Sequence, residues 1–328
     1  MCSLRLVRNG DLGQATPMAQ PVIATLTMNP AIDLSYEVDA IEPTRKLRAR
    51  RECLFPGGGG INVARVLARL GRSVSCVYLA GGTTGPTFEA LVAEHGLHAV
   101  PVPIAGTTRI ATTVHEARSG LEYRFTPPGP NVSEAEWRAC IDRLEEMEAD
   151  WLIASGSLPE GVPTDFYAHL AAQAARKGTR LVLDSSGEAL RAGVAGGGVY
   201  MAKPNQDEFE KLTGRTFATP QAIGEAAREV VRTSGMIAIV VTLGNEGAVL
   251  ATADHFEFCP ALALETKSAV GAGDSFVAGM VHALAGGEDM ADAFRLGMAS
   301  GSAAILTAGT SLALREDIER LYAEYRKA

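Results

Sequence analysis

The chain has 328 residues and a formal net charge of −8, and its length, composition and charge exclude several kinds of protein and of binding partner. Hydrophobic residues make up 47% of it and charged residues 21%, which is typical of a globular protein and argues against disorder or coiled coil for the whole chain. An acidic chain lacks the broad positive field that attracts nucleic acid or anionic membranes, so we expect neither as a partner.

The cysteines and the N-terminal segment indicate where the protein works. The five cysteines are scattered without a C-x-x-C pair, which argues against a disulfide framework or a zinc site and favours the reducing cytoplasm. No apolar run approaches the ~18 residues that span a bilayer, and residues 1–20 lack both an apolar signal core and clear periodicity. We therefore expect a loose extension over residues 1–20 and a folded domain over residues 21–328.

From residue 22 onward, short apolar runs alternate with stretches of helical period. The expected strands cover residues 22–28, 74–79, 151–154, 180–184, 237–243 and 248–252. The expected helices cover residues 63–70, 165–177, 221–233, 274–285, 290–304 and 315–327. This alternation predicts an α/β fold with three α/β/α layers, in which helices cover both faces of a mostly parallel central sheet.

Two stretches, residues 32–55 and 109–125, depart from this alternation. Apolar and polar residues alternate there with little helical period, as at Val114, Tyr123 and Phe125. We expect these stretches to form the hairpin strands of a small antiparallel sheet. No linker rich in proline, glycine or serine separates them from their surroundings, so the small sheet is an insertion into the main domain.

A glycine loop that opens an apolar helix, Gly271-Ala272-Gly273-Asp274, carries the clearest chemistry. Its glycines let backbone N–H groups approach a ligand, and the positive end of the helix dipole lies at the same place. Such a cradle suits a phosphate in transfer, and Asp274 beside it could take a proton from a hydroxyl nucleophile. The alternative is that Asp274 simply caps the helix.

A second group of polar residues, Lys203-Pro204-Asn205-Gln206-Asp207-Glu208, follows a short apolar run. Asn205 and Glu208 are three residues apart and share a helix face, where an amide and a carboxylate can hold hydrated Mg²⁺. The alternative is an ordinary helix start on the surface.

Isolated polar residues near strand ends could bind a sugar phosphate. Asp33 and Asn62 suit sugar hydroxyls, with a turn residue and a helix cap as the respective alternatives. Lys46, Arg48 and Arg109 lie in the expected small sheet, where they could converge on a phosphate or remain solvated edge charges.

Together these segments resemble the PfkB carbohydrate kinase family, whose fold is ribokinase-like. The resemblance runs from about residue 22 to residue 325. It rests on five motifs in order: PGGGGINVAR (56–65), SGSLPEG (155–161), DSSGEAL (184–190), KPNQDE (203–208) and VGAGDS (270–275). Gly59 stands where the 1-phosphofructokinase and tagatose-6-phosphate kinase branches tend to have lysine, so the loop is most similar to that of the 6-phosphofructokinase branch.

The resemblance implies phosphoryl transfer from ATP, with Mg²⁺, to the C1 hydroxyl of fructose 6-phosphate. It implies that Asp274 is the base and that Gly271, Ala272 and Gly273 form the anion hole. The implied sugar-phosphate residues are Asp33, Gly58, Asn62, Lys46, Arg48, Arg109 and Ser157. The implied nucleotide residues are Lys203, Asn205, Thr242, Gly244, Gly247 and Ser302, with Asn205 and Glu208 organising Mg²⁺ through water.

Other implications of the resemblance remain open. The small sheet would be a lid over the site, and the lid would join two chains into a homodimer. Some relatives bind K⁺, here at Ser268, Val270, Ala304 and Gly309, but Thr307 and Ser311 replace an asparagine and an arginine of the related site. Fructose 1-phosphate or tagatose 6-phosphate as substrate, and a non-catalytic nucleotide-binding module, are the alternatives.

Overall fold

The computed structural model describes residues 20–307, 309 and 311–327, so the expected extension over residues 1–20 lies outside the described residues except for Gln20. The large sheet contains β1 (Ile23–Thr27), β4 (Val74–Gly81), β5 (His98–Ile104), β8 (Trp151–Ser155), β9 (Arg180–Asp184), β10 (Val199–Ala202), β11 (Ala238–Thr242), β12 (Gly247–Ala251) and β13 (Phe256–Pro260). They lie in the order β13-β12-β11-β10-β9-β8-β1-β4-β5, and pairing is parallel from β5 to β11. Only the pairs of β12 with β11 and of β13 with β12 are antiparallel in this sheet, as far as the structure describes it.

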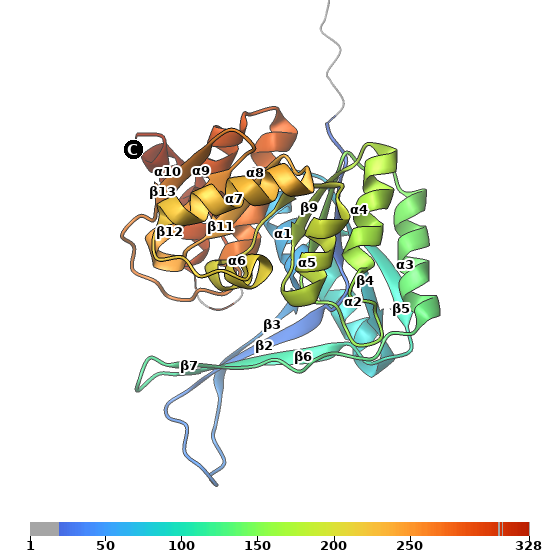
Figure 1. The fold of residues 1–328 in the computed structure, drawn as a ribbon. Coiled ribbons are helices and arrows are strands. Elements are labelled where there is room, and N and C mark those ends of the chain that lie inside the picture. Colours follow the sequence, from blue (N-terminus) through green and yellow to red (C-terminus); the bar gives the residue numbers. More distant parts are fainter. Residues whose placement is uncertain (1–19, 308, 310, 328) are drawn as a thin grey trace, which may run out of the picture.

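Helices cover both faces of the large sheet (Figure 1), and the sheet separates two hydrophobic cores. One core is shared with α1 (Gly59–Arg69), α2 (Gly85–Glu94), α8 (Ala272–Gly286), α9 (Met290–Ala304) and α10 (Arg315–Tyr325). The other is shared with α3 (Glu134–Glu146), α4 (Phe166–Lys177), α5 (Gly187–Gly196), α6 (Gln206–Thr213) and α7 (Pro220–Ser234). Along β1, Ile23 enters the first core while Ala24 and Leu26 enter the second, as expected for a strand buried on both faces. The predicted three-layer fold is confirmed.

The small sheet consists of β2 (Ala31–Val38), β3 (Arg50–Gly57), β6 (Arg109–Glu116) and β7 (Glu122–Phe125), in the order β3-β2-β6-β7. It extends away from the large sheet, and the loop between β2 and β3 reaches farthest (Figure 1). The prediction of a purely antiparallel sheet is wrong, because β2 and β6 pair in parallel. The reason is topological: β2 follows β1 and β6 follows β5, and both of these strands run the same way in the large sheet.

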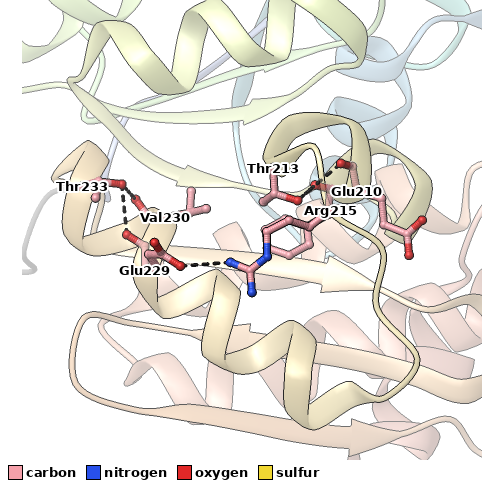
Figure 2. A network of polar contacts seen from close by, with 7 residues as sticks. Glu210, Thr213, Arg215, Glu229, Val230 and Thr233 are labelled. Carbon is pink, nitrogen blue, oxygen red and sulfur yellow. Dashed lines mark hydrogen bonds and ion pairs between the residues drawn. The ribbon is translucent and has the colours of Figure 1, made fainter.

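The helix that follows β10, α6, ends in hydrogen bonds of its own and one surface ion pair with α7. Thr213 donates to the carbonyls of Phe209 and Glu210 within α6 at 2.9 and 3.3 Å, and Arg215, just beyond the helix, donates to Glu229 of α7 at 3.1 Å (Figure 2). Asn205 and Glu208 lie at the other end of α6. Within the described part of the chain, no helix is long and apolar enough to cross a membrane.

Candidate functional site

The N-terminus of α1 forms the first wall of the site. Gly58 caps the helix with a φ of 111°, a conformation that glycine adopts without strain. A β-carbon on Gly59 would overlap Ser155 at the end of β8, so this glycine lets α1 approach the carboxyl edge of the large sheet. Asn62 therefore lies in the first turn, with its backbone N–H donating to the Gly58 carbonyl at 2.9 Å. The alternative of Asn62 as the helix cap is wrong.

The N-terminus of α8 forms the second wall. Gly271 caps this helix with a φ of 72°, and Asp274 is its third residue, so Asp274 is not the cap. The first N–H groups of a helix have no partner within it, and the aligned peptide dipoles make this end positive. The Gly273 N–H is therefore suited to an anion, one residue before Asp274, and the Ala272 N–H makes only a long bond of 3.4 Å to the Ala269 carbonyl.

A single hydrogen bond joins the two walls. Asn62 Nδ2 donates to Oδ2 of Asp274 at 2.9 Å, although the two residues are 212 positions apart. Burial, reinforced by the charge of Asp184, raises the pKa of Asp274 to about 6, while the Asn62 bond and Lys203 oppose this rise. A carboxyl with such a pKa is largely ionised at neutral pH and can accept a proton from a hydroxyl.

Lys203 brings a buried positive charge to the same place. Its Nζ lies 3.2 Å from Oδ1 of Asp184, and the two side chains are 7% and 14% exposed. Burial lowers the pKa of Lys203, but the attraction of Asp184 leaves this pKa above its ordinary value. A β-carbon on Gly273 would lie 3.2 Å from Nζ, so the ammonium lies over the start of α8. We overlooked Asp184 as a site residue, although it ends a predicted strand at the same sheet edge.

Arg65 donates a hydrogen bond to Asn62, and we overlooked it as a site residue. It is 2% exposed, and its Nη1 donates to Oδ1 of Asn62 at 3.3 Å and to the Pro56 carbonyl at 3.4 Å. Its guanidinium carbon lies 5.0 Å from the centre of the Phe55 ring. Because the amide oxygen of Asn62 accepts from a cation, its amide nitrogen is the atom that faces Asp274. The spacing of three residues, which puts Asn62 and Arg65 on one helix face, was the available signal.

Asp33 lies within β2, so its interpretation as a turn residue is wrong. A β-carbon on Gly57 would overlap its carboxylate, which is why the chain has glycine at this point. Burial raises the pKa of Asp33 to about 6 against the attraction of Arg65, Arg109 and Arg124. The result is a shielded carboxyl group that can accept hydrogen bonds from sugar hydroxyls.

Asn205 and Glu208 form a reciprocal capping box at the start of α6. The Glu208 N–H donates to Oδ1 of Asn205 at 2.9 Å, and the Asn205 N–H donates to Oε2 of Glu208 at 2.8 Å. The interpretation of this segment as a helix start is confirmed. Burial, together with the charge of Asp184, raises the pKa of Glu208. Among the described residues no group of three or more histidine, cysteine, aspartate or glutamate side chains could hold a metal ion directly, so Asn205 and Glu208 could act on Mg²⁺ only through its water shell.

The other residues predicted to bind the nucleotide lie in two places, at the end of β11 and on α9. Thr242 adjoins the start of α6, because its N–H donates to the Pro204 carbonyl at 3.0 Å, and it ends β11. Gly244 and Gly247 follow it around the turn into β12, with φ values of 61° and 132°. Ser302 lies on α9 instead, where its hydroxyl is 3.0 Å from that of Tyr325 on α10.

Arg109 and Ser157 are brought together through Asn29, a residue we overlooked. Arg109 donates to the carbonyls of Asn29 at 2.7 Å and of Pro127 at 2.8 Å. Asn29 Nδ2 donates to the Ser157 hydroxyl at 3.3 Å. Asn29 Oδ1 is buried and has no hydrogen-bond partner in the described part of the chain. The end of β1 therefore links the small sheet to the end of β8.

The structure does not bring Lys46 and Arg48 to this site. Both are exposed in the loop between β2 and β3, and neither side chain has a polar partner among the described residues. Arg45 in the same loop is paired with Glu42 at 3.1 Å.

The candidate K⁺ residues surround the end of α9, but several of their polar atoms already have protein partners. The Val270 N–H donates to the Ser268 hydroxyl at 3.3 Å, and the Ala304 carbonyl accepts from the Thr307 hydroxyl at 2.9 Å. Gly309 has a φ of 55°. The Ser311 carbonyl, two residues beyond Gly309, accepts from the Arg69 guanidinium at 2.7 Å, and this fixed positive charge would oppose a cation bound to that oxygen.

Comparisons with known proteins show the family of this chain. The family model for pfkB family carbohydrate kinases matches residues 22–317. The ATP-dependent 6-phosphofructokinase isozyme 2 of Mycobacterium tuberculosis is 39% identical over 305 residues, which are 92% of this chain and 89% of that protein. A 1-phosphofructokinase of Xanthomonas campestris is 36% identical over 265 residues, 79% of this chain and 83% of that protein.

Solved structures agree with this assignment. The crystal structure of phosphofructokinase-2 from Escherichia coli in complex with potassium superimposes with a TM-score of 0.89 at 37% identity, over 93% of this chain and 99% of the other. The predicted ribokinase-like fold and the predicted family are both confirmed. The chain therefore belongs to the pfkB family of carbohydrate kinases.

Proposed function

We propose that this chain transfers the γ-phosphoryl group of ATP to the C1 hydroxyl of fructose 6-phosphate, forming fructose 1,6-bisphosphate. The observation that carries the proposal is the buried carboxyl of Asp274, held by Asn62 beside the positive end of α8. We treat residues 21–328 as one kinase domain with the lid strands inserted. ATP as donor and the free thiols of Cys76 and Cys140 favour the cytoplasm as the place of reaction.

In this reaction Asp274 takes the proton of the C1 hydroxyl as the oxygen–phosphorus bond forms. The bond between the γ-phosphorus and the β,γ-bridging oxygen breaks, and ADP leaves. N–H groups of Gly271, Ala272 and Gly273 and the ammonium of Lys203 stabilise the charge on the phosphoryl oxygens. Asp33 and Asn62, with the backbone at Gly58, align the sugar hydroxyl for in-line attack.

The remaining substrate contacts follow the resemblance. Arg109 and Ser157 bind the sugar phosphate at the root of the lid, and Thr242, Gly244, Gly247 and Ser302 border the nucleotide. Lys46 and Arg48 would reach a phosphate only from a lid in another position or from a second chain. Leu54, Ile110 and Phe125 of the lid are 43%, 41% and 60% exposed, which supports a homodimer through the lid.

Mg²⁺ belongs to the proposal, held through water by Asn205 and Glu208, and when bound it would neutralise charge on the phosphates of ATP. A monovalent cation at Ser268, Val270, Ala304 and Gly309 is left out, because a guanidinium already donates to the adjacent Ser311 carbonyl.

A panel of phosphorylated ketohexoses tests the proposal. With ATP and Mg²⁺, kcat/KM should be highest for fructose 6-phosphate, and the product should be fructose 1,6-bisphosphate by NMR. A higher kcat/KM for fructose 1-phosphate or tagatose 6-phosphate would assign the chain to those branches of the family. Tight ATP binding with no transfer to any sugar would support a non-catalytic nucleotide-binding module instead.

A further inference from the structure

A short segment behind the start of α8, residues 311–313, has an unusual conformation. Leu312 is fully buried and has a φ of 63°, a left-handed value that a leucine rarely adopts. Its Cδ2 occupies the place that a β-carbon on Gly271 would take. The segment is therefore packed directly against the residue that caps α8 and begins the anion hole.

All three carbonyl groups of this segment accept hydrogen bonds from other parts of the chain. Arg69 Nη1, from the last turn of α1, donates to the Ser311 carbonyl at 2.7 Å and to the Ala313 carbonyl at 2.9 Å. The Thr307 hydroxyl lies 3.3 Å from the Leu312 carbonyl oxygen. One guanidinium thus bridges the carbonyl groups of the two residues on either side of the strained leucine, and charge-assisted bonds of this kind are stronger than neutral ones.

Arg69 places a permanent positive charge beside these carbonyl groups. Arg69 is half-buried, and burial lowers its pKa, but a guanidinium stays protonated at any working pH. Arg65, one turn earlier on the same helix, is the charged neighbour that α1 itself contributes. Carbonyl oxygens that face a fixed positive charge are poor ligands for a second cation, because the two charges repel.

We propose that Arg69 is a positioning residue that replaces a bound monovalent cation: it holds residues 311–313 against Gly271 and so keeps the anion hole in its working geometry. The inference rests on the proposed kinase activity. It follows that this enzyme needs no K⁺, and that removal of Arg69 creates a requirement for an added cation.

The first experiment uses the unaltered full-length enzyme. Rates with ATP, Mg²⁺ and fructose 6-phosphate are compared in KCl and in tetramethylammonium chloride, with ionic strength held at about 0.1 M so that screening is constant. We expect rates within about twofold of each other and the same Tm in both salts, since a cation without a site shifts no equilibrium. A several-fold activation or a higher Tm in KCl would overturn the inference. No turnover with any sugar phosphate in either salt would instead count against the proposed function.

The second experiment compares Arg69→Met with Arg72→Met. Arg72 lies just beyond the C-terminal end of α1, but it donates to Nδ1 and the carbonyl of His282 at 3.3 and 2.8 Å, far along α8 from Gly271. We expect Arg69→Met to lower kcat at least about tenfold with little change in KM, because the anion hole acts on the transition state. Added guanidinium or K⁺ should restore part of that loss, and Arg69→Lys should retain more activity than Arg69→Met.

Arg72→Met shows whether a loss of activity in Arg69→Met comes from a displaced anion hole or only from a less stable fold. Arg72→Met should keep its kcat and show no response to guanidinium or K⁺. Equal losses of kcat in the two variants, or a loss in Arg69→Met that neither cation restores, would contradict the inference. If Arg69→Met does not fold, the salt comparison on the unaltered enzyme still decides the question.

Discussion

Two parts of the candidate site differ in how many of their polar contacts are already made within one chain: the group of Asn62, Asp184, Lys203 and Asp274, which we call the floor, and the small sheet with its loops, which we call the lid. At the floor, Asn62 and Asp274 are already hydrogen-bonded, and Lys203 is paired with Asp184, all in partly or fully buried positions. In the lid, Lys46 and Arg48 are exposed without polar partners among the described residues. Under the proposed function, the groups for proton transfer and charge stabilisation are already in contact within one chain, whereas two of the proposed contacts with the sugar phosphate are not.

The floor should be the part most sensitive to substitution. Asp274→Asn keeps the shape and the contact with Asn62 but removes the base, so kcat should fall by about 100-fold or more. Calorimetry should show that ATP binding is retained, because the anion hole and Lys203 are unchanged. Near-normal turnover in this variant would contradict the proposal that the floor, through Asp274, carries out the proton transfer.

The lid should show an effect on binding rather than on turnover. Lys46→Ala and Arg48→Ala should each raise KM for fructose 6-phosphate about tenfold, which corresponds to the loss of one charged contact, with kcat nearly unchanged. Arg45→Ala is the matched control, since Arg45 is paired with Glu42 and should not contact substrate. A fall in kcat for Lys46→Ala or Arg48→Ala, or equal KM values for all three variants, would contradict the proposal that these lid residues act only on sugar-phosphate binding.

The smallest effect should appear in stability. The pKa of Asp274 is about 6 in the folded chain against an ordinary 3.8, so the folded state holds its proton more tightly than the unfolded state. Ionised Asp274 therefore destabilises the fold above about pH 6, by up to roughly 3 kcal/mol, and this penalty vanishes below about pH 4. Asp274→Asn should consequently have a higher Tm than the unaltered enzyme at about pH 8 and an equal one at about pH 4. Calorimetric Tm values with the opposite order at high pH would show that the carboxylate stabilises its surroundings.

Much of the fold could be predicted because its strands are continuous apolar runs. The exceptions have local causes: β5 contains Pro101 and Pro103, which are typical of edge strands and obscure the strand signal, and β13 is a short edge strand. The parallel pairing of β2 with β6 could not be predicted, because it depends on where β1 and β5 lie in the large sheet.

The site could be predicted where a motif carries its own chemistry, as at Gly271 to Asp274. The supporting residues could not, because their partners are distant in sequence. Arg65 acts through Asn62, Asp184 through Lys203, and Asn29 through Arg109 and Ser157. The position of Lys46 and Arg48 relative to the substrate depends on the lid, which the sequence pattern describes only as strands and a loop.

The pH dependence of kcat/KM tests the central claim most directly, because kcat/KM reports the pKa of the base in the free enzyme. For fructose 6-phosphate, kcat/KM should fall about tenfold for each pH unit below about pH 6, as Asp274 becomes protonated, and should recover on return to neutral pH. A kcat/KM that stays constant down to about pH 5 would show that no buried carboxyl of this kind accepts the proton, and would contradict the assignment of Asp274 as the base.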